Sequence, residues 1–421
     1  MHQKLIVLLV LTVFLFQDLT ASGFSIYEQG TRATGMAGAF IARANDASAI
    51  FYNPAGLTHV KGLQFSAGTT VINTQFAFTG PSELDPQYYT PAEEGTFYPV
   101  HAYGAYRISE KFSAGLGLYS MFGLSSTWGS KDNPWVGRQL ATNTELQTLF
   151  INPVAAYRAF DFLSISAGFS YVQGSVKLEK SVLFIPRLIF GESALEASAA
   201  GYGFNLALQL KPFSFMELGA VYRSNVTMDF KEGDARFIFP DTGDDVINQE
   251  IATYFPSKTK GSAKLTLPEM TGLGLAVNFT DNLSAEFDYV KFGWSSYDKL
   301  KVSFRDSVAG KTMTESPKNY EDSYSLRFGL EYQVDCNLSL RAGYIWDRHA
   351  VPEKYVEPTL PEGNRHNYTL GVGYQWRGFR IDASYQALIQ DDRRVENSVH
   401  DFNGKYTGLA NLYGLTFGYT F

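Results

Sequence analysis

The sequence predicts an all-β fold, a 14-stranded antiparallel transmembrane β-barrel with an N-terminal plug, or hatch, inside its lumen. Three observations favour it. The 421 residues include 33 Phe, 26 Tyr and 5 Trp, more aromatic residues than a typical water-soluble domain contains. Beyond the N-terminal leader, no window approaches the roughly 18 consecutive apolar residues that a membrane helix needs. Strand-like segments are joined alternately by short turns and long loops, which is typical of an up-and-down barrel.

The first segment, residues 1–21, is expected to be a signal peptide that is cleaved after Ala21. Lys4 is its basic residue, an apolar run extends from Leu5 to Phe16, and small residues follow, which is the usual order of parts in a secretory leader. Because Leu19 is bulky for its position before this cut, a neighbouring cleavage site is also open.

The second segment, residues 22–60, is the predicted hatch. Gly and Ala recur there without the period of two that a strand requires, and the segment ends in the rigid turn Asn53-Pro54-Ala55-Gly56. Small side chains with internal turns suit a segment that packs inside a larger structure. An even number of strands places both chain ends on the short-turn, periplasmic side, from which this segment can fold back into the barrel. A lumen of this width needs such a plug, because wall side chains alone cannot fill it.

Residues 61–421 are predicted to form the barrel. The expected strands are 63–78, 98–107, 112–122, 144–159, 163–181, 198–210, 214–231, 259–279, 283–301, 319–333, 338–349, 365–376, 379–390 and 406–421. Because alternate side chains of a strand face opposite sides, Leu415 and Phe417 should contact lipid, while Thr416 and Gly418 should face the lumen. A pair of β-sandwiches and a β-propeller are alternatives, but neither explains long strands with alternating short and long connections.

Charged residues form a further pattern on the lumen side of neighbouring strands. They are Glu286, Asp288, Arg327, Glu331, Arg341, Arg380 and Asp382. We interpret them as a ladder of ion pairs that braces the barrel, with direct substrate contact as the alternative. A hatch that carries Glu28, Arg32, Arg43 and Asp46 could dock on this ladder.

Composition and motifs exclude several functions. With 35 Lys and Arg against 42 Asp and Glu, the chain is mildly acidic, so a nucleic-acid partner is not expected. The single cysteine, Cys336, has no partner for a disulfide within the chain. The sequence contains no phosphate-binding loop, no His-Glu-x-x-His, no Gly-x-Ser-x-Gly and no cluster of metal ligands, so neither a cofactor, a metal site nor an enzyme is expected.

Several short motifs together resemble the FadL and TodX family of outer-membrane transporters for long-chain fatty acids and hydrophobic compounds. They are Gly23-Phe24, Asn53-Pro54-Ala55, Leu267-Pro268-Glu269-Met270, Gly293-Trp294-Ser295, Leu340-Arg341-Ala342-Gly343, the loop from Val351-Pro352 to Leu360-Pro361, and Arg365-His366. The resemblance implies a hatch-closed barrel in the outer membrane of a Gram-negative bacterium. The implied partners are a long-chain fatty acid or another hydrophobic small molecule and outer-membrane lipid, and the protein is expected to be a monomer.

The resemblance also implies a route, in which outer loops catch the cargo, an internal pocket binds it, and it leaves sideways through a gap at a kinked third strand. Residues Ser120 to Gly123 match the kink region, and the glycine permits a break there. Ser120 and Phe122 are expected to contact the substrate. In the family pocket a serine and two basic residues meet the carboxylate. Ser120 and Lys180 align with two of these, and Lys318 follows two residues after the third position, Ser316.

Apolar residues in the long loops are expected to catch the cargo. Leu183 and Phe184 lie in the third outer loop, and Phe237 and Phe239 lie in the fourth. The alternative is that these loops pack on each other. Phe24, at the mature N-terminus, is expected to cap the internal pocket.

The predicted function is therefore passive uptake of long-chain fatty acids or related hydrophobic compounds, gated by Asn53, Pro54 and Ala55 of the hatch and by Gly123. A general diffusion porin is the alternative, and an outer-membrane lipid hydrolase is a less favoured one. A basic partner at Lys180 favours carboxylates, but the sequence leaves fatty acid and aromatic hydrocarbon both open.

Overall fold

The computed structural model describes residues 23–84, 87–130 and 132–421. The predicted signal peptide at residues 1–21 and its cleavage after Ala21 lie outside the described residues, as does Ser22, the first residue of the predicted hatch. Within the described ranges, no helix is both long and apolar enough to cross a membrane.

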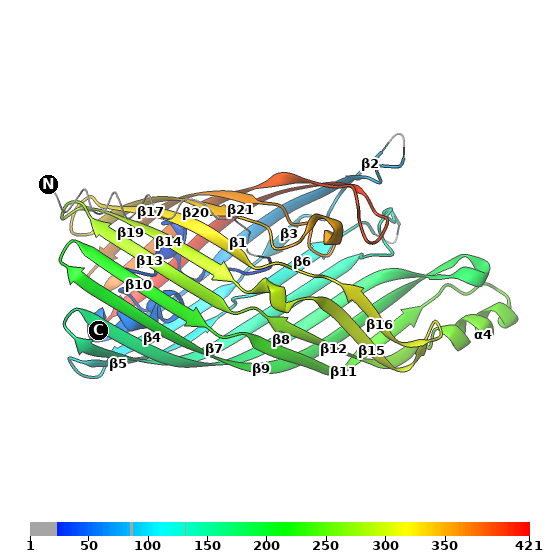
Figure 1. Ribbon diagram of the computed structural model, residues 1–421, viewed down its shortest axis with the longest axis horizontal. Coiled ribbons are helices and arrows are strands. Elements are labelled where there is room, and N and C mark those ends of the chain that lie inside the picture. Colours follow the sequence, from blue (N-terminus) through cyan, green and yellow to red (C-terminus); the bar gives the residue numbers. More distant parts are fainter. Residues whose placement is uncertain (1–22, 85–86, 131) are drawn as a thin grey trace.

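The strands form one antiparallel sheet that closes on itself as a barrel (Figure 1). β1 (Leu63–Gly80) pairs on one side with β4 (Val100–Arg107) and on the other with the last strand, β21 (Gly404–Thr420). The pairing of β1 with β21 runs over nearly the full length of both strands and joins the two ends of the sheet. The predicted closed antiparallel barrel is therefore confirmed.

The described sheet has 21 strand segments, which group into the 14 predicted barrel strands. Besides β1 and β21, the undivided strands are β7 (Asn143–Phe160), β8 (Leu163–Phe184), β9 (Ile189–Phe213), β18 (Leu338–Asp347), β19 (Arg365–Trp376) and β20 (Phe379–Val395). The second barrel strand consists of β2 (Tyr88–Pro91), β3 (Gly95–Phe97) and β4. The third consists of β5 (Phe112–Tyr119) and β6 (Gly123–Thr127).

The seventh to tenth barrel strands are each divided in two, whereas the sequence predicted continuous seventh, eighth and ninth strands and, for the tenth, only residues 319–333. They are β10 (Met216–Arg223) with β11 (Val226–Ile238), β12 (Lys258–Leu267) with β13 (Met270–Asn278), β14 (Leu283–Phe292) with β15 (Lys299–Val308), and β16 (Lys311–Pro317) with β17 (Ser323–Gln333). The break between β12 and β13 falls at Pro268, which has no backbone N–H to donate. The short helix η3 (Trp294–Ser296) occupies the break between β14 and β15.

The third and fourth outer loops contain more regular structure than predicted. β8 and β9 stay paired up to their tip, where η2 (Ile185–Arg187) turns the chain, so residues 182–197 form mostly a strand hairpin. The fourth loop contains α4 (Asp245–Tyr254), which lies at the far right of Figure 1. The extended strands pack on α4 and lack a regular apolar and polar alternation, so the sequence pattern did not reveal them.

Residues 23–60 lie inside the barrel, where Figure 1 shows them in blue near the end that carries the short turns. They form α2 (Thr31–Thr34), α3 (Ala49–Tyr52) and the 3₁₀ helix η1 (Pro54–His59), and none of them is exposed. The Asn53 side chain caps η1 by accepting a hydrogen bond from the Ala55 N–H at 3.1 Å. The division of the chain at residue 60 into hatch and barrel remains a prediction about domains, but these residues do fill the lumen.

Glycines allow this segment to approach its neighbours closely. A Cβ atom on Gly56 would lie 1.7 Å from the Ala44 carbonyl oxygen, so no larger residue fits there. A Cβ atom on Gly35 would lie 2.9 Å from the Cα of Gly371 in the barrel wall. The small residues that marked this segment in the sequence are therefore needed for packing, both within the segment and against the wall.

Candidate functional site

A cavity of about 1050 Å³, here called the inner cavity, lies between the N-terminal residues and the barrel wall. Its lining includes residues 23–28, the second barrel strand around Tyr98 and Pro99, and the third barrel strand around Ser120 and Phe122. The volume is at the upper end of the range for pockets that hold a small organic ligand. The inner cavity is thus large enough for a lipid-sized molecule.

A smaller space of about 80 Å³, here called the outer pocket, lies toward the long loops. Its walls are mainly apolar side chains of the fourth to ninth barrel strands, among them Leu146, Val176 and Leu265. Lys318 and Glu145 are the charged residues of this lining. The outer pocket therefore offers an apolar surface with few charges.

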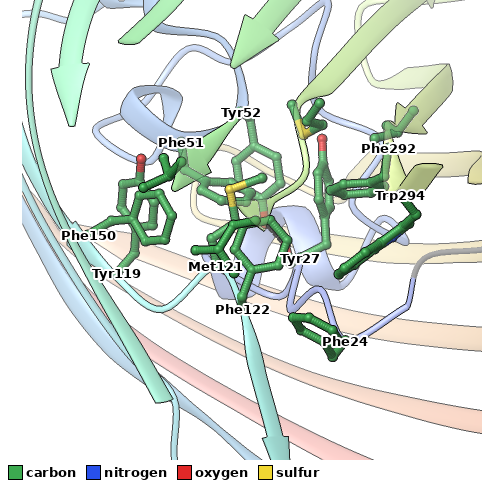
Figure 2. Close-up of a cluster of buried hydrophobic side chains, with 14 of the residues drawn as sticks. Phe24, Tyr27, Phe51, Tyr52, Tyr119, Met121, Phe122, Phe150, Phe292 and Trp294 are labelled. Carbon is green, nitrogen blue, oxygen red and sulfur yellow. Dashed lines mark hydrogen bonds between the residues drawn. The ribbon is translucent and has the colours of Figure 1, made fainter. Parts of the chain in front are cut away.

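Phe24 belongs to the lining of both cavities. Its ring is buried, with its centroid 4.4 Å from that of Trp294 and 6.2 Å from that of Phe122, and both contacts are edge-on. Figure 2 shows Phe24 below Phe122 and Trp294. The ring therefore forms part of the partition between the inner cavity and the outer pocket.

Backbone hydrogen bonds hold Phe24 against the third barrel strand. The Gly123 N–H donates to the Phe24 carbonyl oxygen at 3.0 Å, and the Ile26 N–H donates to the Met121 carbonyl oxygen at 2.8 Å. Ser25 and Phe122 form an isolated antiparallel bridge between these bonds. The N-terminal residues thus pair with the wall at the point where the third barrel strand is interrupted.

The interruption lies between β5 and β6. β5 pairs with β4 of the second barrel strand, whereas β6 pairs with β7, and among the described residues its link to the second-strand side is a bridge between Ala92 and Trp128. At the break, the Phe122 carbonyl oxygen accepts a hydrogen bond of 2.6 Å from the Thr148 hydroxyl. The inner cavity reaches the wall here, because residues from both edges line it.

The structure brings together some of the predicted site residues and not others. Phe24, Ser120, Phe122 and Gly123 all line the inner cavity, and Lys318 lines the outer pocket. Lys180, Leu183, Phe184, Phe237 and Phe239 line neither space. The roles of all these residues in binding remain predictions.

The predicted loop residues pack in a second apolar cluster. Phe184 and Phe237 are buried there, together with Ile251 and Phe255 from the fourth outer loop. The Phe239 ring packs beside Phe255, with 4.9 Å between ring centroids. The two loops therefore do pack on each other, which was the alternative interpretation, and capture of cargo at this surface remains a prediction.

Sequence reasoning missed Glu357, which pairs with Lys318. Both side chains are buried, at 8% and 6% exposure respectively. The Thr359 hydroxyl donates to the same carboxylate at 2.5 Å, and His400 Nε2 lies 3.2 Å from it. Burial alone would raise the pKa of Glu357, but the Lys318 ammonium and these hydrogen bonds lower it to about 2. No local pattern marks Glu357, since Lys318 and His400 lie in parts of the chain far from it in sequence.

The predicted ladder of lumen charges is present, and all seven side chains are buried or half-buried. Arg341 is its centre, because its Nε donates to Glu331 at 2.6 Å and its Nη1 donates to Asp382 at 2.8 Å. Arg380 donates to the other oxygen of Asp382 at 2.6 Å. These pairs link the tenth, eleventh and thirteenth barrel strands across the lumen wall.

The N-terminal segment docks on this ladder. Arg32 donates to both oxygens of Glu331, at 3.1 and 2.9 Å, and also pairs with Asp46. Arg43 lies 3.5 Å from the same carboxylate. Glu28 instead accepts a hydrogen bond of 3.0 Å from an amide side chain of β20. Docking through Arg32 and Arg43 is as the sequence predicted.

Two further carboxylates bind the backbone of this segment. Asp288 accepts from the N–H groups of Phe40 and Ile41 at 2.8 and 3.0 Å, and Glu286 accepts from that of Ala42 at 2.6 Å. Asn53 adds a bond from its amide to a carbonyl oxygen of β9 at 2.9 Å. These hydrogen bonds are buried, and breaking any of them would leave a desolvated donor or acceptor without a partner, so the segment is firmly attached.

His349, in the long loop between β18 and β19, predicts an acid-sensitive loop. Burial and the nearby Arg393 lower its pKa from 6.5 to about 4, and its Nε2 accepts from Arg393 at 2.7 Å. The His349 imidazole takes up a proton more readily in the unfolded loop than in the folded one. The stabilisation of the folded loop should therefore be full above pH 6.5 and should be lost as the pH falls from 6.5 to about 4. The protection factors of the backbone amides of residues 348–364, which correct for the slower intrinsic exchange at acid pH, should therefore fall between pH 6.5 and about 4. His349→Gln, which keeps an acceptor, should lose most of that dependence, and an equal response in both proteins would contradict the assignment.

Comparisons with known proteins agree with this architecture. Residues 12–421 match the family model described as Outer membrane protein transport protein (OMPP1/FadL/TodX). The long-chain fatty acid transport protein of Salmonella typhi is 24% identical over 428 residues, which cover 95% of this chain and 94% of the relative. The crystal structure of a Pseudomonas aeruginosa FadL homologue aligns with a TM-score of 0.82 at 21% identity, over 95% of this chain and 100% of that one. The P. putida toluene transporter TodX aligns with a TM-score of 0.73 at 19% identity, over 96% and 99% of the two chains. Both structures share the barrel fold.

Proposed function

Because this chain belongs to the outer membrane protein transport family (OMPP1/FadL/TodX), we propose that it takes up long-chain fatty acids or related hydrophobic compounds by passive flow. The family consists of outer-membrane transporters of Gram-negative bacteria and not of enzymes. One of the relatives reported above is named a long-chain fatty acid transport protein and another a toluene transporter, so both kinds of cargo are within the proposal.

The observation that carries the proposed route is the interrupted third barrel strand, which faces the inner cavity. An unpaired stretch of wall beside a cavity of about 1050 Å³ offers a path from the lumen to the surrounding lipid. The N-terminal residues bridge this break through Ser25 and Phe122. Displacement of these residues would therefore open the wall and the inner cavity together.

Release is the demanding step of such a transport. Burial of about fifteen methylenes at about 0.8 kcal/mol each would bind a fatty acid tail by on the order of 10 kcal/mol. The cavity must therefore be weakened once the cargo is inside. In our proposal, cargo entering from the outer pocket displaces the Phe24 ring from Phe122 and Trp294, and the N-terminal residues then leave the break in the third barrel strand.

The attachment of residues 23–60 favours this route over a general diffusion porin. The segment fills the lumen and is held by buried ion pairs and hydrogen bonds to several strands. Flow along the barrel axis would require these bonds to break, whereas flow through the wall break requires only the N-terminal residues to move. A porin should pass current and small sugars when reconstituted in a bilayer, and the proposed carrier should pass little of either.

Gly123→Phe tests the wall route. A Cβ atom on Gly123 would lie 2.7 Å from Ile26 Cδ1, the end of a flexible side chain, so a larger residue can be accommodated while it fills the break. We expect uptake of labelled oleate or toluene by intact cells to fall by at least about tenfold, as expected for an obstructed path that costs more than about 1.4 kcal/mol.

Ala199→Phe is the matched control, because Ala199 also lines the inner cavity but lies on β9, away from the break. The new phenylalanine fills a similar volume of the inner cavity but should reduce uptake much less than Gly123→Phe does. If both variants reduced uptake equally, the inner cavity would matter but the break would not be the exit. If Gly123→Phe folded and transported normally, sideways release would be excluded.

A further inference from the structure

We propose that Glu357 determines cargo specificity. Its carboxylate pairs with the Lys318 ammonium in the place that a cargo carboxylate would take, so the transporter selects uncharged hydrophobic molecules over fatty carboxylates. This inference rests on the proposed transport function and specifies the class of its cargo. It departs from the expectation that Lys180 and Lys318 meet a carboxylate. Three observations carry it.

The first observation is the position of Lys318. Among the described residues, it is the only lysine or arginine that lines the outer pocket. Its side chain is 6% exposed and bonds to Glu357, whose side chain is 8% exposed. The ammonium that could have received an anionic headgroup is therefore already neutralised by the chain itself.

The second observation is how firmly Glu357 is held. Its carboxylate also receives the Thr359 hydroxyl, and the neighbouring carbonyl oxygen of Pro358 accepts from the indole N–H of Trp128 at 2.9 Å. The depressed pKa of Glu357, about 2, means that it is charged throughout the physiological range. A cargo carboxylate that displaced it would leave a buried, unpaired charge, which is a large penalty.

The third observation is that the inner cavity offers no free cation among its lining residues. Arg327 lies 4.0 Å from Asp347 and stacks over the Tyr27 ring, and Arg365 lies 3.6 Å from Glu362. Two further carboxylates, on Glu28 and Glu145, also line this cavity and accept hydrogen bonds from backbone and side-chain amides, and the nearby Lys177, which interacts electrostatically with Glu145, is itself paired with Glu179. The lining therefore has an excess of negative charge, which repels an anionic cargo but not a neutral one.

Lys180 does not supply the missing cation. It lies at the outer end of β8, its residue is exposed, and it lines neither cavity. Lys180 does interact electrostatically with Glu357 and Lys318, so it adds to the attraction that holds Glu357 in the cluster.

The test compares two ligands that share one acyl chain, oleate and methyl oleate, bound to the purified full-length protein at a pH of about 8, where oleate is ionised. We expect the wild type to bind the ester at least about tenfold more tightly than oleate, as expected for a cavity that carries excess negative charge. In Glu357→Gln the ammonium of Lys318 becomes available, and the ratio should shift by at least about tenfold toward oleate.

The double variant with Lys318→Met and Glu357→Gln is the control, because it removes the pair as a unit and leaves no unpaired charge. Its ratio should return to the wild-type value, since the gain for oleate requires the lysine. Thr359→Val, which removes one hydrogen bond from Glu357 and keeps its charge, should shift the ratio in the same direction by a smaller factor. If Glu357→Gln fails to fold, the ratio measured for Thr359→Val tests the role of Glu357 in its place.

A wild type that binds oleate as tightly as the ester, or a ratio that stays constant in the foldable variants, would overturn the role of Glu357 and leave the transport function intact. If the wild type bound neither ligand, and cells took up neither, the transport function itself would fail, and this inference with it.

Discussion

Asp288→Leu is expected to loosen the N-terminal segment and to make the barrel conduct ions in a planar bilayer. The Asp288 carboxylate is fully buried and accepts from the N–H groups of Phe40 and Ile41. Leucine would leave both donors unpaired, at a cost of about 1–3 kcal/mol for each. Because the donors belong to the segment that fills the lumen, the loss should appear first as partial opening, with frequent current steps that the wild type lacks.

Asp288→Asn is the matched control, since its side-chain oxygen can still accept a hydrogen bond and its volume is nearly the same. It should remain closed or nearly so. With the exposed Cys336 replaced by serine, a cysteine at Ala47, which lies in this segment and is buried, should become reactive to a water-soluble maleimide in the leucine variant only. An equally silent bilayer and an unreactive cysteine in Asp288→Leu would show that this carboxylate does not hold the segment in place.

Phe24→Ala is expected to lower the affinity for hydrophobic cargo by about tenfold or more and to reduce uptake. The ring packs against Trp294 and Phe122, and a buried Phe→Ala change usually costs about 3–5 kcal/mol of packing energy, part of which is binding surface here. Loss of the ring would also join the outer pocket to the inner cavity, so cargo would no longer displace the cap that bridges the wall break.

Phe24→Leu keeps most of the apolar volume and serves as the control, with a loss of less than about threefold expected for a swap between hydrophobic residues. Binding and cellular uptake should be measured on the same variants, because a cap that only lines the cavity would change binding alone. Unchanged uptake in Phe24→Ala would remove Phe24 from the proposed mechanism.

Much of the barrel could be predicted from the sequence, because its signals are local. Alternation of apolar and small or polar residues placed the inward and outward faces correctly, as β21 shows: Leu415 and Phe417 are exposed, and Thr416 is buried. The ladder around Arg341 followed from the same alternation. The breaks in the seventh, ninth and tenth barrel strands were not predicted, although Gly293 lies in the ninth-strand break and Pro317 precedes the tenth-strand break, because a single glycine or proline does not distinguish a break from the end of a strand.

The candidate site was predictable only in part. Phe24, Ser120 and Phe122 were found through resemblance, and they do line one cavity. The pairing of Lys318 with Glu357 was not found, because these residues are 39 positions apart, one in the break of the tenth barrel strand and the other in the loop between β18 and β19. Phe184 and Phe237 were recognised as apolar loop residues, but a sequence pattern cannot distinguish a surface that binds cargo from one that binds another loop.

The contact between α2 and the last strand has a consequence for biogenesis. The hydroxyls of Thr31 and Thr416 lie 2.7 Å apart, although 385 positions separate them in the chain, and Arg32 reaches a carboxylate 299 positions away. The N-terminal residues are exported first and therefore cannot form these contacts until the C-terminal residues have also been exported. Since β21 also completes the seam with β1, we expect enclosure of the N-terminal residues and sealing of the cylinder to be a single late event during assembly.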